Sequence, residues 1–153
     1  MLDVKPFKQT PGFCGPACLK IVLDYYGVEK SETELAKLSN CTKERGTSAE
    51  NLVNAAKKLG FKAEIKDSCF LDDIKKYMDK KIPVIVDWFL SDEGNYSVVA
   101  GIDNENIYLL DPSLGHLRAI NLNTFYRIWF DFPGTYLTKK EDIIIRRIIA
   151  IKP

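Results

Sequence analysis

The fold is decided by a short stretch near the N-terminus, Gln9-Thr10-Pro11-Gly12-Phe13-Cys14-Gly15-Pro16-Ala17-Cys18-Leu19. From Cys14 onward, apolar residues recur at helical spacing, at Cys18, Ile21, Val22 and Tyr25. Pro16 suits the first turn of a helix, because its missing N–H costs nothing there. We therefore expect a helix that begins at Cys14 and ends before Gly27.

Cys14 lies where a nucleophile would be placed. The first N–H groups of a helix lack intrahelical partners, and the positive end of the helix dipole favours a thiolate over a thiol. Gln9, five residues upstream, could supply a side-chain amide to an oxyanion hole beside the backbone N–H of Cys14. Two simpler interpretations stay open: a small, half-buried cysteine, and a loop glutamine that caps the helix.

Length and composition indicate one globular domain, which we expect to span residues 1–153. The charges nearly cancel, 22 basic against 21 acidic, and no basic stripe interleaved with aromatic residues predicts nucleic acid as a partner. No apolar run approaches the roughly 18 residues of a membrane span, and the N-terminus shows no secretory signal. These features predict a cytoplasmic protein.

The cysteines do not read as a disulfide framework in a leaderless chain of this size. They are Cys14, Cys18, Cys41 and Cys69. Cys14 and Cys18 are one helical turn apart, but a zinc site would need two further ligands and the chain has a single histidine, His116. We predict no metal and no cofactor. Outside Cys14, the cysteines are expected to pack in the core.

Helical patterns fill most of the first half of the chain. Capping-box patterns at 31–34 and 47–50 predict two helices, the second starting after Thr47 and ending at Gly60. A short strand at 61–65 and a helix at 71–78 are expected to follow.

The second half reads as antiparallel sheet. The apolar run 83–88 predicts a buried strand, and the segments 96–102 and 107–111 flank a polar turn as in a hairpin. A strand at 117–120, a short helix from Asn121 to Trp129 and a terminal strand at 143–151 complete the pattern. The prediction is an α+β fold with N-terminal helices packed on a C-terminal antiparallel sheet.

The order of these elements and of their motifs resembles the C39 family of papain-like cysteine peptidases. The motifs are Gln9, the run Cys14-Gly-Pro-Ala-Cys18-Leu19, the strand entry Gly94-Asn95-Tyr96-Ser-Val-Val99 and the pair Asp111-Pro112. The resemblance covers about residues 6–151 and implies a papain-like fold. It also implies that the protein cleaves a leader peptide after a Gly-Gly pair, with an ABC transporter as a partner.

The resemblance assigns a role to each matching residue. Gln9 matches the oxyanion-hole glutamine, Cys14 the nucleophile, and Asp111 the acid that orients the catalytic imidazole. Asn95 occupies the position of the catalytic histidine. An asparagine neither carries nor transfers a proton at neutral pH, so general acid–base catalysis, typically worth ~10²- to 10⁴-fold, is expected to be lost.

His116 is the one imidazole that could replace the missing base. If the hairpin ladder continued beyond Pro112, residue 116 would lie near residue 93, at the same end as Asn95 and Asp111. The simpler interpretation is a partly exposed loop or strand histidine.

Two functions therefore stay open. The first is an attenuated C39-like cysteine peptidase, favoured by the retention of Gln9, Cys14 and Asp111. The second is a catalytically inactive peptide-binding module, favoured by Asn95. Acyl transfer to a non-peptide substrate has no positive sign in the sequence.

Overall fold

A six-stranded sheet with the order β1-β8-β2-β3-β4-β5 runs through the part of the chain that the structure describes, residues 1–91 and 93–153. In this computed structural model, all of its neighbouring strands are antiparallel. The strands are β1 (Lys62–Lys66), β2 (Val84–Leu90), β3 (Glu93–Ile102), β4 (Asn106–Asp111), β5 (His116–Asn121) and β8 (Arg147–Lys152). The predicted α+β, papain-like class is confirmed.

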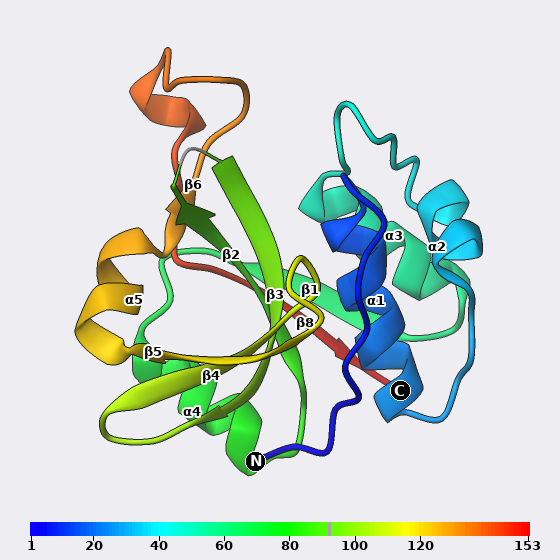
Figure 1. Cartoon of the computed structure of the whole chain (residues 1–153), viewed down its shortest axis with the longest axis horizontal. Helices are drawn as coiled ribbons and strands as arrows, with labels where there is room; N and C mark the ends of the chain where they lie inside the picture. The colour runs from blue at the N-terminus through cyan, green and yellow to red at the C-terminus, as the bar shows by residue number, and fades with distance from the viewer. Residues whose placement is uncertain (92) are drawn as a thin grey trace.

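Helices cover both faces of this sheet (Figure 1). The helices α1 (Cys14–Tyr25), α2 (Glu32–Leu38) and α3 (Ala49–Lys58) pack on one face, and α4 (Leu71–Asp79) and α5 (Leu122–Ile128) on the other. Successive strand residues point to opposite faces. Thus Ile85 packs with α1 and α3, whereas Val84 and Val86 pack with α4 and α5. Burial on both sides explains the continuous apolar run of β2.

The N-terminal capping of α3 differs from the prediction by one residue. Ser48, not Thr47, is the cap, and its hydroxyl accepts a hydrogen bond from the Asn51 N–H at 3.1 Å. The Thr47 hydroxyl instead donates to the Ser39 carbonyl at 2.5 Å. Thr47 therefore ties the start of α3 to the end of α2. The predicted Ser31 cap of α2 is confirmed.

The C-terminal strand predicted at 143–151 is divided in two. Arg146 has a φ of 47°, outside the extended region, and separates β7 (Ile144–Ile145) from β8. Its N–H donates to the Trp129 carbonyl at 3.0 Å, and its Nε donates to the Cys69 carbonyl at 2.6 Å. These bonds hold the turn at which the chain leaves β7, which pairs with β6 (Phe130–Asp131), and enters β8 of the main sheet.

Two further differences concern segment lengths. The strand predicted from residue 96 begins at Glu93, so Gly94 and Asn95 belong to β3 and are held by its pairing with β2. A 3-10 helix, η1 (Lys140–Asp142), precedes β7 and was not predicted.

None of the helices in the described residues is long and apolar enough to cross a membrane.

Candidate active site

Cys14 is the first residue of α1, as the sequence predicts. The residue before the helix, Phe13, provides no side-chain cap, so the first N–H groups of α1 are not taken by a capping side chain. The loop before Cys14 is fixed at two points. The Gln9 N–H donates to the Pro112 carbonyl at 2.9 Å, and Thr10 donates twice to the Glu32 carboxylate, at 2.8 Å and 2.6 Å.

Gln9, Cys14 and Asn95 come together around one groove, which has a volume of about 290 Å³ and is also lined by Gly94 and Ser113. A larger hollow of about 550 Å³ shares Cys14, Gly94 and Asn95 with it. It extends toward α3 and β6. We call the two together the Cys14 groove. The structure thus joins residues that are separated by 86 positions in the sequence.

The electrostatics of Cys14 do not match the thiolate expected from the sequence. Burial raises the pKa of the Cys14 thiol to about 11, and the nearby Asp87 adds to this. The backbone N–H groups of Tyr96 and Gly15 oppose the shift by hydrogen bonding toward the sulfur, but they do not offset the burial. At neutral pH the sulfur is therefore a thiol, which is a poor nucleophile.

Asp111 is fully buried, and its carboxylate already has partners. One oxygen accepts bonds from the Ser113 N–H at 2.9 Å and from the Ser113 hydroxyl at 2.7 Å. The other pairs with the Arg118 guanidinium at 3.1 Å, which lies 5.4 Å from the Trp88 ring centroid. Asp111 contacts the groove only indirectly, because Ser113 lines it.

His116 does not line the Cys14 groove. The chain turns after β4, so His116 pairs with Asp111 in the β4–β5 register. The ladder therefore does not continue beyond Pro112 to bring residue 116 near residue 93, and His116 is a strand histidine, as the simpler interpretation expects. The His116 ring is exposed, and its Nδ1 lies 3.0 Å from the Leu117 carbonyl. Among the described residues that line the groove there is no imidazole.

Three charged residues near the site were not singled out from the sequence. They are Asp87 on β2, Asp131 on β6 and Arg118 on β5. Asp87 carries a visible signal, because an acid interrupts the apolar run 83–88. A buried charge needs a partner or a function. Asp131 likewise interrupts an apolar stretch, between Phe130 and Phe132, whereas Arg118 carries no comparable signal, and only the tertiary fold brings the two to the site.

Gly12 fixes the approach of the chain to Cys14, and we expect Gly12→Ala to destabilise the fold by about 1–3 kcal/mol. Its φ is +85°, and a Cβ there would collide with the Lys43 carbonyl oxygen and lie 2.8 Å from the Lys43 Cα. Urea denaturation measures the loss. Gly27→Ala is the matched control, since Gly27 has a φ of +81° with nothing within 4 Å. Equal losses for the two variants would mean that the Lys43 contact contributes nothing.

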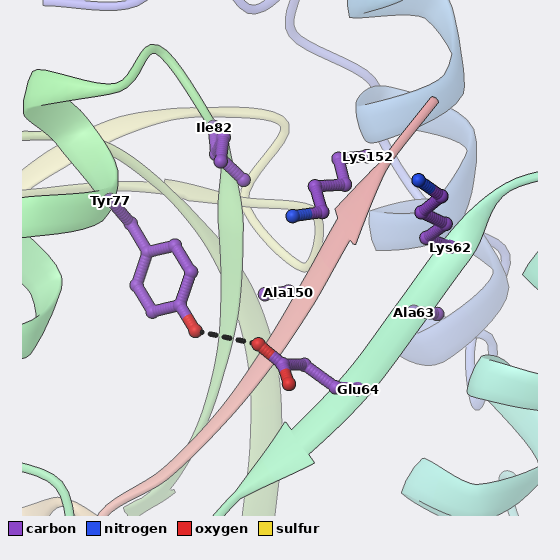
Figure 2. A pocket seen from close by; sticks show the side chains of 7 residues that line it. All are labelled: Lys62, Ala63, Glu64, Tyr77, Ile82, Ala150 and Lys152. Atoms are coloured by element: carbon purple, nitrogen blue, oxygen red, sulfur yellow. Dashed lines mark hydrogen bonds between the residues drawn. The ribbon is translucent and has the colours of Figure 1, made fainter.

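A separate hollow of about 150 Å³ lies between β1, β8 and α4 and contains none of these residues (Figure 2). In it the Tyr77 hydroxyl donates to the Glu64 carboxylate at 3.0 Å, which ties α4 to the edge strand. In the described part of the chain, no group of three or more His, Cys, Asp or Glu side chains could hold a metal ion.

Comparison with known proteins identifies the family. Residues 8–138 match the peptidase C39 family. The chain belongs to the peptidase C39 family. It is 35% identical, over 93% of its length and 97% of the relative, to an uncharacterized protein of Methanothermobacter marburgensis.

Two solved structures of C39 domains share the fold. The peptidase domain of Streptococcus ComA, a bifunctional ABC transporter involved in quorum sensing, superposes with a TM-score of 0.78. It is 27% identical, and the match covers 98% of each chain. A double-glycine-motif protease solved in complex with its leader peptide has a TM-score of 0.73 at 22% identity, over 99% of this chain and 93% of that one.

Proposed function

We propose that this C39 domain binds an extended peptide of the Gly-Gly leader type in the Cys14 groove without detectably cleaving it. The observation that carries this proposal is the state of Cys14. Burial raises the pKa of its thiol to about 11, and the groove is lined by Asn95, to which the C39 resemblance assigns the position of the catalytic imidazole. A groove of this kind can hold a peptide, but it lacks a group that protonates the leaving amine.

The surroundings of Cys14 support peptide binding. The groove is open along the start of α1 and the start of β3, and Gly94 contributes no side chain to its wall. Backbone groups near a groove can pair with an extended peptide, as in other cases of strand-like recognition. An ABC transporter is the partner that the ComA likeness suggests, since that relative is itself one.

The test is a binding and cleavage measurement on a set of Gly-Gly peptides. We expect saturable binding, with Cys14→Ala binding as tightly as the unchanged chain, and no product detectable by mass spectrometry. Cys14→Ala removes the sulfur but leaves the groove, so it separates peptide binding from peptide cleavage. Rapid cleavage that disappears in Cys14→Ala would overturn the proposal and make the domain an active peptidase.

A second function, slow turnover, has one specific observation in its favour. Gln9 lines the groove together with Cys14, and the backbone N–H groups of Gly15 and Tyr96 hydrogen-bond toward the sulfur. Such donors could stabilise an oxyanion or a thiolate once formed. In that case cleavage should rise steadily with pH, because the thiolate fraction grows as the pH approaches the pKa of about 11.

A further inference from the structure

Two adjacent carboxyl groups, those of the buried Asp87 and the half-buried Asp131, lie beside Cys14 in the larger part of the groove. Asp87 is 2% exposed and sits on β2, opposite Tyr96 of β3. The Asp131 carboxyl group is close enough to raise the pKa of Asp87, and among the described residues no N–H or hydroxyl group donates to the buried Oδ1 of Asp87. A buried polar atom without a partner is costly, so its retention calls for an explanation.

The position of Asp131 is built by its neighbours. The rings of Phe130 and Phe132 stack on Phe89 of β2, with centroid distances of 5.3 Å and 5.1 Å. One carboxylate oxygen of Asp131 accepts from the Phe132 N–H at 2.7 Å. The other side of the carboxylate lies against Gly94, where any Cβ would collide with it. The pair is therefore held by packing and does not come together by chance.

The charge of the surrounding hollow is negative on balance. Its charged lining residues are Arg45, Glu50, Asp87, Asp131, Asp142 and Arg147. Arg147 is already committed, because its Nε and Nη2 donate to the Asp67 carboxylate at 2.6 Å and 2.9 Å, with Glu50 at 4.0 Å. Arg45 is left to balance Asp131 and Asp142. A ligand that brings a positive charge and N–H donors complements this wall.

We propose that Asp87 and Asp131 form a subsite beside Cys14 that binds a cationic side chain, lysine or arginine, of the bound peptide. The inference rests on the proposed function, since the ligand is a peptide in the same groove. The ammonium or guanidinium group donates to Asp131 and to the unpartnered Oδ1 of Asp87. The bound cation favours ionisation of the pair, so the proton shared by the two carboxyl groups leaves to solvent. Two carboxylates and one cation then carry a net charge of −1, which is the charge that the singly protonated pair carried before binding.

The proton of the pair provides a measurable signal. Burial and the neighbouring Asp131 raise the pKa of Asp87 to about 9, so the free protein keeps this proton at pH ~7 to 8. A bound cation favours the ionised pair and lowers that pKa, and binding then releases a proton. The charged or titratable groups that face Asp87 are Cys14, Asp67, Tyr96, Asp131 and Arg147. Among these groups, only Arg147 favours the ionised form of Asp87. The Arg147 guanidinium is already paired with the Asp67 carboxylate.

The experiment compares Gly-Gly peptides in which one lysine is scanned along the sequence with the same peptides carrying norleucine. Calorimetry at pH ~7.5, in two buffers of different ionisation enthalpy, gives the affinity and the number of protons released. At one position we expect lysine to bind at least about tenfold more tightly than norleucine. That lysine peptide should release up to about one proton, and the norleucine peptide none.

Three variants separate the pair from the general charge of the hollow. Asp87→Asn keeps the shape and the charge of the protonated pair, so it should fold, bind lysine peptides and release no proton. Asp131→Asn should abolish the preference for lysine. Asp142→Asn removes an acid from the same hollow and is the matched control, which should leave proton release unchanged.

Each result decides the matter. Equal affinity for lysine and norleucine at every position, with peptides still bound, overturns the subsite but leaves the proposed function in place. Proton release that persists in Asp87→Asn overturns the assignment to this pair. Failure of every peptide to bind overturns both the subsite and the proposed function.

Discussion

Asn95→His is expected to raise the rate of Gly-Gly peptide cleavage by about 10²- to 10⁴-fold, which is the usual contribution of general acid–base catalysis. Asn95 lines the groove together with Cys14, so an imidazole there can pair with the sulfur and protonate the leaving amine. The C39 resemblance assigns Asp111 the role of orienting the ring. A carboxylate has about four lone-pair sites, and Ser113 and Arg118 occupy three of them.

The same variant should change the chemistry of the sulfur without any substrate. In the unchanged chain, site-resolved alkylation of Cys14 should accelerate only above pH ~9, in keeping with a pKa raised to about 11. An imidazolium beside the sulfur favours the thiolate, so the profile of Asn95→His should move to lower pH. Asn95→Gln is the matched control and should keep the original profile. A folded Asn95→His chain with an unmoved profile and no cleavage would falsify the view that histidine is the missing part.

Much of the fold could be predicted because its signals are local. The start of α1 at Cys14 follows from helical spacing and Pro16, and the Ser31 cap from a short-range pattern. The break at Arg146 could not be predicted in this way. It is held by bonds to Trp129 and Cys69, which are distant in the sequence, and a run of isoleucines alone favours one continuous strand.

The candidate site also contains features that local sequence signals predict and features that depend on the whole fold. Gln9, Cys14 and Asn95 could be grouped from motif order, and the structure brings them to one groove. The thiol state of Cys14 could not be foreseen. The helix terminus is a local feature that favours a thiolate, whereas the burial that opposes it is contributed by the whole fold.

His116 shows how a register argument fails. The β3–β4 hairpin pairs Ile102 with Ile107, but the chain reverses again after Asp111, and His116 starts the next strand. Pro112 and Gly115 carry the turn signals that end the ladder, so the simpler interpretation of His116 as an exposed strand residue holds. The chain therefore holds a histidine next to the orienting acid in the sheet, yet outside the groove that contains Cys14.

Arg118→Met is expected to lower the free energy of unfolding by about 3 kcal/mol, because it leaves the buried Asp111 carboxylate without its counter-charge. Asp111 is 0% exposed, and the two Ser113 donors do not supply a positive charge. The Arg118–Asp111 ion pair adds little net stability, because the attraction between the two charges is largely offset by the cost of removing both from water. The double variant Arg118→Met/Asp111→Leu should therefore recover most of the loss.

Urea denaturation of the unchanged chain, Arg118→Met, Asp111→Leu and the double variant measures these terms as a double-mutant cycle. The recovery is the decisive result, because a loss caused only by removing the Arg118 contact with Trp88 would persist when Asp111 is also replaced. If the double variant is as unstable as Arg118→Met, the guanidinium acts through packing on the indole. Recovery would mean that Asp111 requires Arg118 at a site where the C39 resemblance assigns it an imidazole to orient.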